Sequence, residues 1–168
     1  KDDATRLSLL GNYLESIKGT VFRQTQFAEF ELRMHEMVEA GTPLTGDALS
    51  TLYAQIVKKY YGHEQGVCVV DPYVEHEWAM IPHFYNSYYV FQYATSFTAS
   101  SALSEKVLAG EPGATQRYLA FLSGGHSKYP IELLKNAGVD MTTEEPLELT
   151  MKKMNRVMDQ MESMLDGK

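Results

Sequence analysis

The sequence predicts an all-α, multi-helix fold, and three features lead to this prediction. Apolar residues recur at spacings of three and four through most of the chain, which is typical of amphipathic helices. Stretches that contain Gly or Pro separate these periodic segments, and most segments have the length of an ordinary helix. Residues 67–70 could form a short strand, but Asp71-Pro72 ends that run.

Three helices are expected in the first part of the chain. The first ends near Gly19 and carries one apolar stripe, which consists of Leu7, Leu10, Leu14 and Ile17. The second reaches from about residue 21 to residue 40, and its apolar face consists of Phe22, Phe27, Phe30 and Met34. Residues 41–43, Gly-Thr-Pro, end this helix. Thr45 or Asp47 can then cap a third helix over about residues 48–61.

Four more helices are expected after Pro82. We place them over about residues 84–100, 113–123 and 130–137, with a last long helix from Pro146. One stripe of the last helix is apolar and consists of Leu147, Met151, Met154, Met158, Met161 and Leu165. Flexible thioethers commonly fill an irregular core or edge, and a methionine-rich groove for a target is the less common alternative.

Composition and charge exclude several classes of protein. A chain of 168 residues with 44% hydrophobic residues is expected to form one helical domain, residues 1–168, or a fragment of one. The net charge of −7, with no basic stripe to offset it, argues against nucleic-acid binding. A single cysteine, Cys68, excludes an internal disulfide. No apolar run has the length of a membrane span, so we expect a cytoplasmic protein without a membrane partner.

Residues 81–93 concentrate the side chains that can carry chemistry: four tyrosines, two phenylalanines and one histidine. If a helix begins at Phe84, then Tyr85, Tyr89 and Tyr93 share one face, because they are four residues apart. Phenol hydroxyls need partners when they are buried, or they point into a wet cleft. A packed aromatic helix explains the same residues, and composition alone favours that explanation.

His83 can converge with Tyr85 and Tyr89 only from outside such a helix. Within the helix it would project about 200° away from Tyr85, because each residue turns about 100°. Pro82 favours a separate turn that ends the preceding segment. From that turn, the imidazole and the phenols could together donate hydrogen bonds to a developing oxyanion.

The sequence holds no complete metal site. Three His-Glu pairs invite a search for the zinc motif H-E-x-x-H, in which two histidines four residues apart bind the ion. The positions that would need the second histidine hold Glu39, Val67 and Met80. His35 and Glu39 could supply two ligands, although solvated side chains are the more common arrangement. We therefore assign no metal ligand within this chain and expect that it does not bind zinc tightly by itself.

Two stretches carry a resemblance to a known family. Residues 19–31 read GTVFRQTQFAEFE, and residues 81–95 contain IPHFY followed by YVFQYAT. Both resemble the C-terminal part of oligoendopeptidase F, in the bacterial branch of the thimet-oligopeptidase-like zinc metallopeptidases. Residues 121–125, FLSGG, and residues 134–141, LKNAGVDM, resemble later segments of the same family in the same order. The resemblance covers nearly the whole chain.

The resemblance implies a zincin-type helical clamshell peptidase that cleaves short peptides. In that family a zinc ion sits on an H-E-x-x-H helix and a following glutamate, and both would lie upstream of residue 1. The chain is thus expected to be the C-terminal part of the catalytic domain, inactive by itself, with the N-terminal remainder and an oligopeptide as partners. The family motif assigns catalytic roles to His83, Tyr85 and Tyr89, and we assign substrate binding to Tyr88 and Tyr93. The alternative is a non-catalytic helical domain that binds a peptide or a partner helix through its aromatic cleft.

Overall fold

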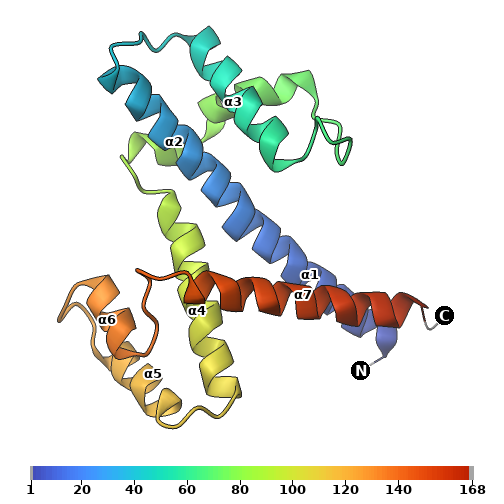
Figure 1. The fold of residues 1–168 in the computed structure, drawn as a ribbon, viewed down its shortest axis with the longest axis vertical. Helices are drawn as coiled ribbons and strands as arrows, with labels where there is room; N and C mark the ends of the chain where they lie inside the picture. Colours follow the sequence, from blue (N-terminus) through green and yellow to red (C-terminus); the bar gives the residue numbers. More distant parts are fainter. Residues whose placement is uncertain (1, 167–168) are drawn as a thin grey trace. The chain divides into compact units, whose positions relative to one another are not determined.

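The computed structural model describes residues 2–166, and every regular element in this range is helical. The helices, labelled in Figure 1, are α1 (Asp3–Ile17), α2 (Arg23–Glu39), α3 (Gly46–Tyr60), α4 (Phe91–Leu108), α5 (Ala114–Ser123), α6 (Pro130–Asn136) and α7 (Glu145–Asp166). A π-helical turn, Lys18–Phe22, joins α1 to α2, and two 3-10 helices span Pro72–Met80 and Pro82–Tyr85. The all-α prediction is confirmed. None of these described helices has the length and apolar character needed to cross a bilayer.

The chain divides into two compact units, which we describe separately. One unit is Phe22–Ala94, and the other contains the preceding residues together with those from Thr95 onward. In the Phe22–Ala94 unit, α3 packs against α2 and against the 3-10 helix Pro72–Met80. Its core is aromatic: the Phe30 and Tyr53 rings are fully buried and meet edge-on with their centroids 5.1 Å apart. Thr45 caps α3 as predicted, because its hydroxyl accepts the Ala48 N–H at 3.2 Å.

In the other unit, α7 lies along α1 and α5 lies beside α6, as Figure 1 shows. Its core is built mainly from small or branched residues, namely Ala99, Ala102, Leu103, Ala137 and Val139. Alanines permit close approach of the neighbouring segments, because they occupy little volume. The small side chains therefore allow α4 to pack closely through its buried residues Ala99, Ala102 and Leu103.

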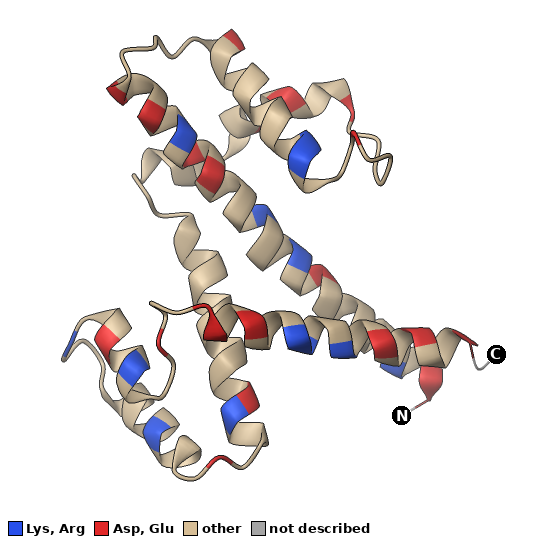
Figure 2. Ribbon diagram, in the orientation of Figure 1, with Lys and Arg blue, Asp and Glu red and all other residues tan. Residues whose placement is uncertain are grey.

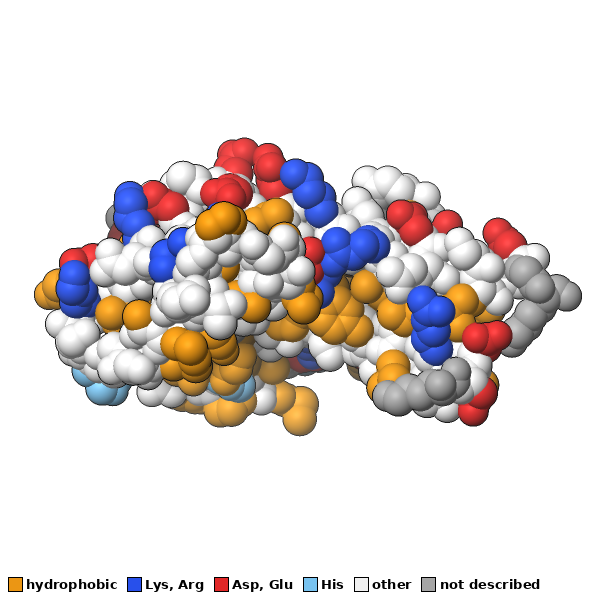
Figure 3. Space-filling model, turned by 90° about the horizontal axis from the view of Figure 1, so that it is seen from below, with side chains coloured by type: hydrophobic (Ala, Val, Ile, Leu, Met, Phe, Trp, Pro, Cys, Tyr) orange, Lys and Arg blue, Asp and Glu red, His pale blue; other side chains and the backbone are white. Residues whose placement is uncertain are grey.

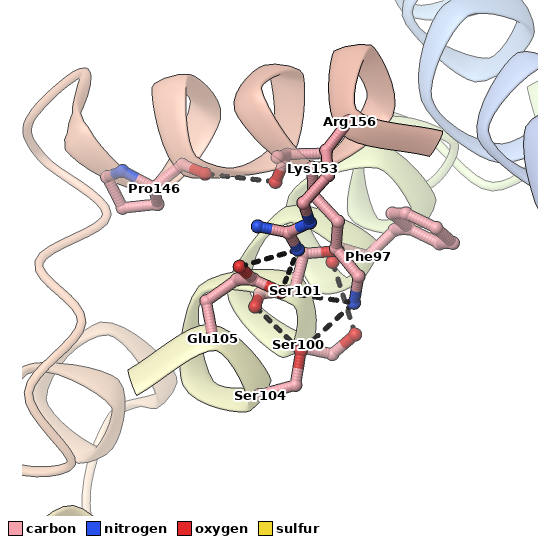
Figure 4. A network of polar contacts seen from close by, with 9 residues as sticks. Phe97, Ser100, Ser101, Ser104, Glu105, Pro146, Lys153 and Arg156 are labelled. Atoms are coloured by element: carbon pink, nitrogen blue, oxygen red, sulfur yellow. Dashed lines mark hydrogen bonds and ion pairs between the residues drawn. The ribbon is translucent and has the colours of Figure 1, made fainter. Parts of the chain in front are cut away.

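Polar contacts join α4 to α7 in the same unit (Figure 4). The Arg156 guanidinium binds both carboxylate oxygens of Glu105 at 2.9 Å, and Lys153 Nζ donates to Ser104 Oγ at 3.2 Å. Figure 2 shows that the cations of α7 lie in its middle and the acidic residues towards both ends. The basic middle of α7 therefore lies where Glu105 of α4 can pair with it. The predicted methionine stripe of α7 is only partly buried, whereas Thr150 and Val157 are buried.

Two predictions about local structure are wrong. Residues 67–70 form no strand, and the Val70 N–H instead donates to His63 Nδ1 at 3.1 Å. The helix expected from Phe84 begins only at Phe91. Tertiary packing explains this delay, because the Phe84 ring is held between α2 side chains at 6.0 Å from Phe27 and 5.4 Å from Phe30. Aromatic residues have modest helix propensity, so such contacts can override the local pattern.

Candidate functional site

Three of the predicted residues meet in one cluster, although they come from different elements. His83 lies in the 3-10 helix Pro82–Tyr85, Tyr89 in the following turn, and Tyr93 in the first turn of α4. His83 Nε2 and the Tyr93 hydroxyl oxygen lie 3.1 Å apart and share a hydrogen bond. The His83 ring stacks on Tyr89 with centroids 5.9 Å apart, and Tyr89 meets Tyr93 edge-on at 5.7 Å. We call His83, Tyr89 and Tyr93 the His83 cluster.

The other two predicted tyrosines lie outside this cluster. Tyr85 is 90% exposed and takes part in none of the ring contacts among the described residues. Tyr88 stacks on His35 with ring centroids 4.6 Å apart. The prediction that Tyr85, Tyr89 and Tyr93 share one helical face is therefore wrong, because only Tyr93 belongs to α4. The expected convergence of His83 with a tyrosine pair is found, but the pair is Tyr89 and Tyr93.

The His83 cluster can act as a set of hydrogen-bond donors. Tyr89 is 40% exposed, so a molecule from solvent can reach part of this side chain. The hydrogen bond with the Tyr89 side chain, and to a lesser degree burial, raise the pKa of Tyr93 above its ordinary value. The Tyr93 phenol therefore stays protonated near neutral pH. An imidazole and two phenols in contact form an arrangement suited to an oxygen that gains negative charge.

A partly buried polar network anchors the 3-10 helix Pro72–Met80, which precedes His83 in the chain. The Tyr53 hydroxyl donates to Glu77 Oε2 at 2.5 Å, and Arg23 forms an ion pair with the same carboxylate. Gln26 Nε2 donates to the Tyr53 hydroxyl at 3.3 Å. Burial and the Glu77 carboxylate raise the pKa of Tyr53. Nearby, Trp78 Nε1 donates to Ser50 Oγ at 3.1 Å, so Pro72–Met80 is anchored on both α2 and α3.

The described residues do not fit a zinc site. Within residues 2–166, no group of three or more His, Cys, Asp and Glu side chains lies close enough together to hold a metal ion. Several histidines instead have separate partners: His35 stacks on Tyr88, His63 accepts the Val70 N–H, and His76 Nδ1 lies 3.2 Å from Ser50 Oγ. Among the described residues, His35 and Glu39, which could supply two ligands, thus have no third ligand close enough to complete a metal site.

A separate groove of about 850 Å³ lies between α4, α5 and α6. Its lining is mainly apolar and includes Leu103, Val107, Phe121, Leu122, Leu133 and Leu134, with His126 and Lys128 as polar members. None of the predicted site residues belongs to it. Figure 3 shows that hydrophobic side chains are exposed at several places on the face drawn. Of the residues that line the groove, Leu122 is 58% exposed. The groove offers apolar area but no arrangement of groups for chemistry.

Glu31, which contacts the turn between His83 and Tyr89, was not predicted from the sequence. Glu31 is 1% exposed, and its Oε1 accepts the Tyr88 N–H at 2.7 Å. A signal for Glu31 was available, since it lies four residues from both Phe27 and His35 and so shares their helical face. An acidic side chain on a face that also carries a core phenylalanine needs a partner. The network of Tyr53 and Glu77 had no comparable local signal.

Comparison with known proteins places the chain among peptidases. The family model for Peptidase family M3 matches residues 1–153. The chain is 46% identical over 165 residues to Oligopeptidase PepF of Bacillus subtilis (strain 168), covering 98% of this chain and 24% of that protein. It is 43% identical over 166 residues to an Oligoendopeptidase F homolog of Lactococcus lactis subsp. lactis, covering 99% and 27%. The chain thus spans about a quarter of the length of these curated relatives.

A solved structure agrees with these relatives. The crystal structure of oligoendopeptidase-F from Enterococcus faecium superposes on the chain with a TM-score of 0.93 at 48% sequence identity. The match covers 100% of this chain and 32% of that one. At this identity the likeness extends to sequence as well as fold.

Proposed function

The chain belongs to peptidase family M3, and from this premise we propose that it is the C-terminal part of the catalytic domain of a zinc-dependent oligoendopeptidase. In this proposal the whole protein hydrolyses short peptides in the cytoplasm. The zinc ligands, including the H-E-x-x-H helix, belong to an N-terminal remainder that packs with this chain. The absence of a fitting cluster among residues 2–166 supports the assignment of the ligands to that remainder.

The observation that carries the proposal is the convergence of His83, Tyr89 and Tyr93 in mutual contact. Hydrolysis of a peptide bond passes through a tetrahedral intermediate, whose former carbonyl oxygen carries negative charge. We propose that the cluster faces this oxygen and that Tyr89, whose ring is partly open to solvent, donates a hydrogen bond to it. Tyr93 shares a hydrogen bond with His83 and in this scheme orients the imidazole towards the substrate.

Tyr85 and Tyr88 lie outside the His83 cluster, and we propose a different role for each. The family motif assigns Tyr85 a catalytic role, and its 90% exposure leaves the hydroxyl available to a substrate. Tyr88 is 45% exposed and stacked on His35, so it can offer one ring face to a peptide side chain. Both roles remain predictions. Donors that act only on the charged intermediate should affect turnover more than substrate affinity.

The test is Tyr89→Phe in the intact peptidase. This change removes one hydroxyl and keeps the ring, so packing on His83 is retained. We expect kcat to fall by roughly 10²–10³, the scale of one lost oxyanion donor, with KM and the melting temperature nearly unchanged. Tyr73→Phe is the matched control, because Tyr73 is 84% exposed and lies outside the cluster. Unchanged kcat in Tyr89→Phe would refute the proposed role of the cluster.

A further inference from the structure

We propose that Glu31 is a positioning residue: it fixes the turn at residues 86–90 and thereby places Tyr89 against His83. Glu31 acts through the backbone of Tyr88, whose N–H donates to Glu31 Oε1 at 2.7 Å. The consequence for catalysis rests on the function proposed above. The structural claim, that Glu31 holds this turn, stands independently of it.

One face of α2 provides the support. Phe27, Glu31 and His35 are spaced four residues apart, so their side chains lie one above the other on the helix. Phe27 meets Phe84 edge-on with centroids 6.0 Å apart, and His35 stacks on the Tyr88 ring at 4.6 Å. Glu31, between them, accepts the Tyr88 N–H. Three residues on successive turns of α2 thus hold the segment from Phe84 to Tyr88. This segment connects His83 to Tyr89.

The backbone of Tyr88 shows why this support is needed. Tyr88 has φ 55°, and it is the one residue other than glycine with positive φ in the part of the chain that the structure describes. The left-handed region is disfavoured for a side chain with a Cβ, and such residues persist only where the surroundings impose the conformation. The bond to Glu31 is suited to this task. It is short, its acceptor is a carboxylate, and Glu31 is 1% exposed, so water cannot easily replace it.

The conformation of Tyr88 determines the direction of the next residue. With Tyr88 left-handed, the chain turns back so that the Tyr89 ring stacks on His83 at 5.9 Å and meets Tyr93 at 5.7 Å. In an ordinary extended or right-handed conformation at Tyr88, the Tyr89 side chain would leave this position. Loss of the Glu31 acceptor should therefore free the turn and misplace the Tyr89 hydroxyl while the α2–α3 core is retained.

The experiment compares three variants of the intact peptidase: Glu31→Leu, Glu31→Gln and, as a control, Glu36→Leu. Leucine removes the acceptor, and glutamine keeps one carbonyl oxygen that can accept the Tyr88 N–H. Glu36 makes a matched control on the same helix, because it is exposed and pairs with Arg33. The first measurement is amide hydrogen exchange by mass spectrometry in peptides that cover residues 86–90 and, for comparison, α3. The second is kcat and KM.

In Glu31→Leu we expect exchange in the turn to rise about tenfold or more, the scale of one lost charge-assisted hydrogen bond, with α3 unchanged. We expect kcat to fall by a similar factor with little change in KM. Glu31→Gln should recover most of both properties, and Glu36→Leu should match the wild type. This combined pattern would support the proposal, because a general core residue would lose protection in α3 as well, and a residue that only holds the turn would leave kcat unchanged.

Three outcomes would overturn it. The first is unchanged exchange in the turn of Glu31→Leu, and the second is an equal loss of protection in α3, which would make Glu31 a general core residue. The third is a selective loss in the turn with normal kcat, in a protein where Tyr89→Phe does lower kcat. If Tyr89→Phe has no effect either, the proposed function fails, while selective exchange still supports the structural claim.

Discussion

The sharpest stability prediction concerns the hydroxyl of Tyr53, a fully buried side chain at the centre of the polar network in the Phe22–Ala94 unit. Tyr53→Phe keeps the ring, which packs on Phe30 at 5.1 Å, and removes only the oxygen. That oxygen donates to Glu77 at 2.5 Å and accepts from Gln26 at 3.3 Å. The variant therefore takes one donor from a carboxylate and leaves a buried amide without its acceptor.

The expected loss follows from these two contacts. A hydrogen bond to a charged group contributes about 1.5–3 kcal/mol, and a buried group left unpaired costs about 1–3 kcal/mol. The Glu77 side chain is 29% exposed and keeps its ion pair with Arg23, so water and Arg23 compensate part of the first contribution. Gln26 is 1% exposed, so water cannot replace the hydrogen bond that its amide loses. We expect Tyr53→Phe to lower the free energy of unfolding by about 2–4 kcal/mol.

The assay is urea denaturation of the chain, followed by the fluorescence of Trp78, the single tryptophan, whose ring lies 6.3 Å from Phe30 in the same core. Adding Gln26→Leu to Tyr53→Phe should restore part of the loss, because the buried amide that has lost its acceptor is then absent as well. Tyr73→Phe, on an exposed ring, should change the free energy by less than about 0.5 kcal/mol. A loss below about 0.5 kcal/mol in Tyr53→Phe would refute the reasoning.

Two further predictions concern pH. Hydrogen bonds from Lys135 and Thr142 lower the pKa of Asp140 from 3.8 to about 2. Asp140 therefore stabilises the fold above pH 3.8, and the gap in melting temperature between wild type and Asp140→Asn should close as the pH falls to about 2. A gap independent of pH would contradict this. Burial and a hydrogen bond to Glu29 raise the pKa of Tyr60 from 10.0 to about 12, so stability should decline as the pH rises through this window. Tyr60→Phe should decline less steeply over that range, and parallel curves would contradict the assignment.

The helices that could be predicted from the sequence are those whose signals are local. The cap at Thr45 and the apolar spacing of α3 both lie within the helix itself, so the prediction and the structure agree closely there. The same holds for α5, α6 and α7, each of which begins after a Gly- or Pro-containing turn or at a proline near its N-terminus. Local periodicity is enough where a helix buries one continuous stripe.

The segment after Pro82 could not be predicted in this way. Its pattern from Phe84 onward fits a helix, yet Phe84 is held by aromatic rings of α2 and Tyr88 by Glu31, both far away in the sequence. Such long-range contacts leave no trace in a local window. The candidate site was accordingly predicted in part: His83, Tyr89 and Tyr93 converge, but Tyr85 does not join them. The functional roles of all four remain predictions.

The bond between Glu31 and Tyr88 also has a consequence for the order of folding. It joins residues 57 positions apart, whereas α2 and α3 are consecutive helices that can pair across a short connection. Closing a flexible loop of that length costs about 3–4 kcal/mol of chain entropy. We therefore expect the turn to form after the aromatic core has brought Phe84 to α2. During refolding, helical circular dichroism should return first, and the His83 cluster should assemble in a later, slower phase.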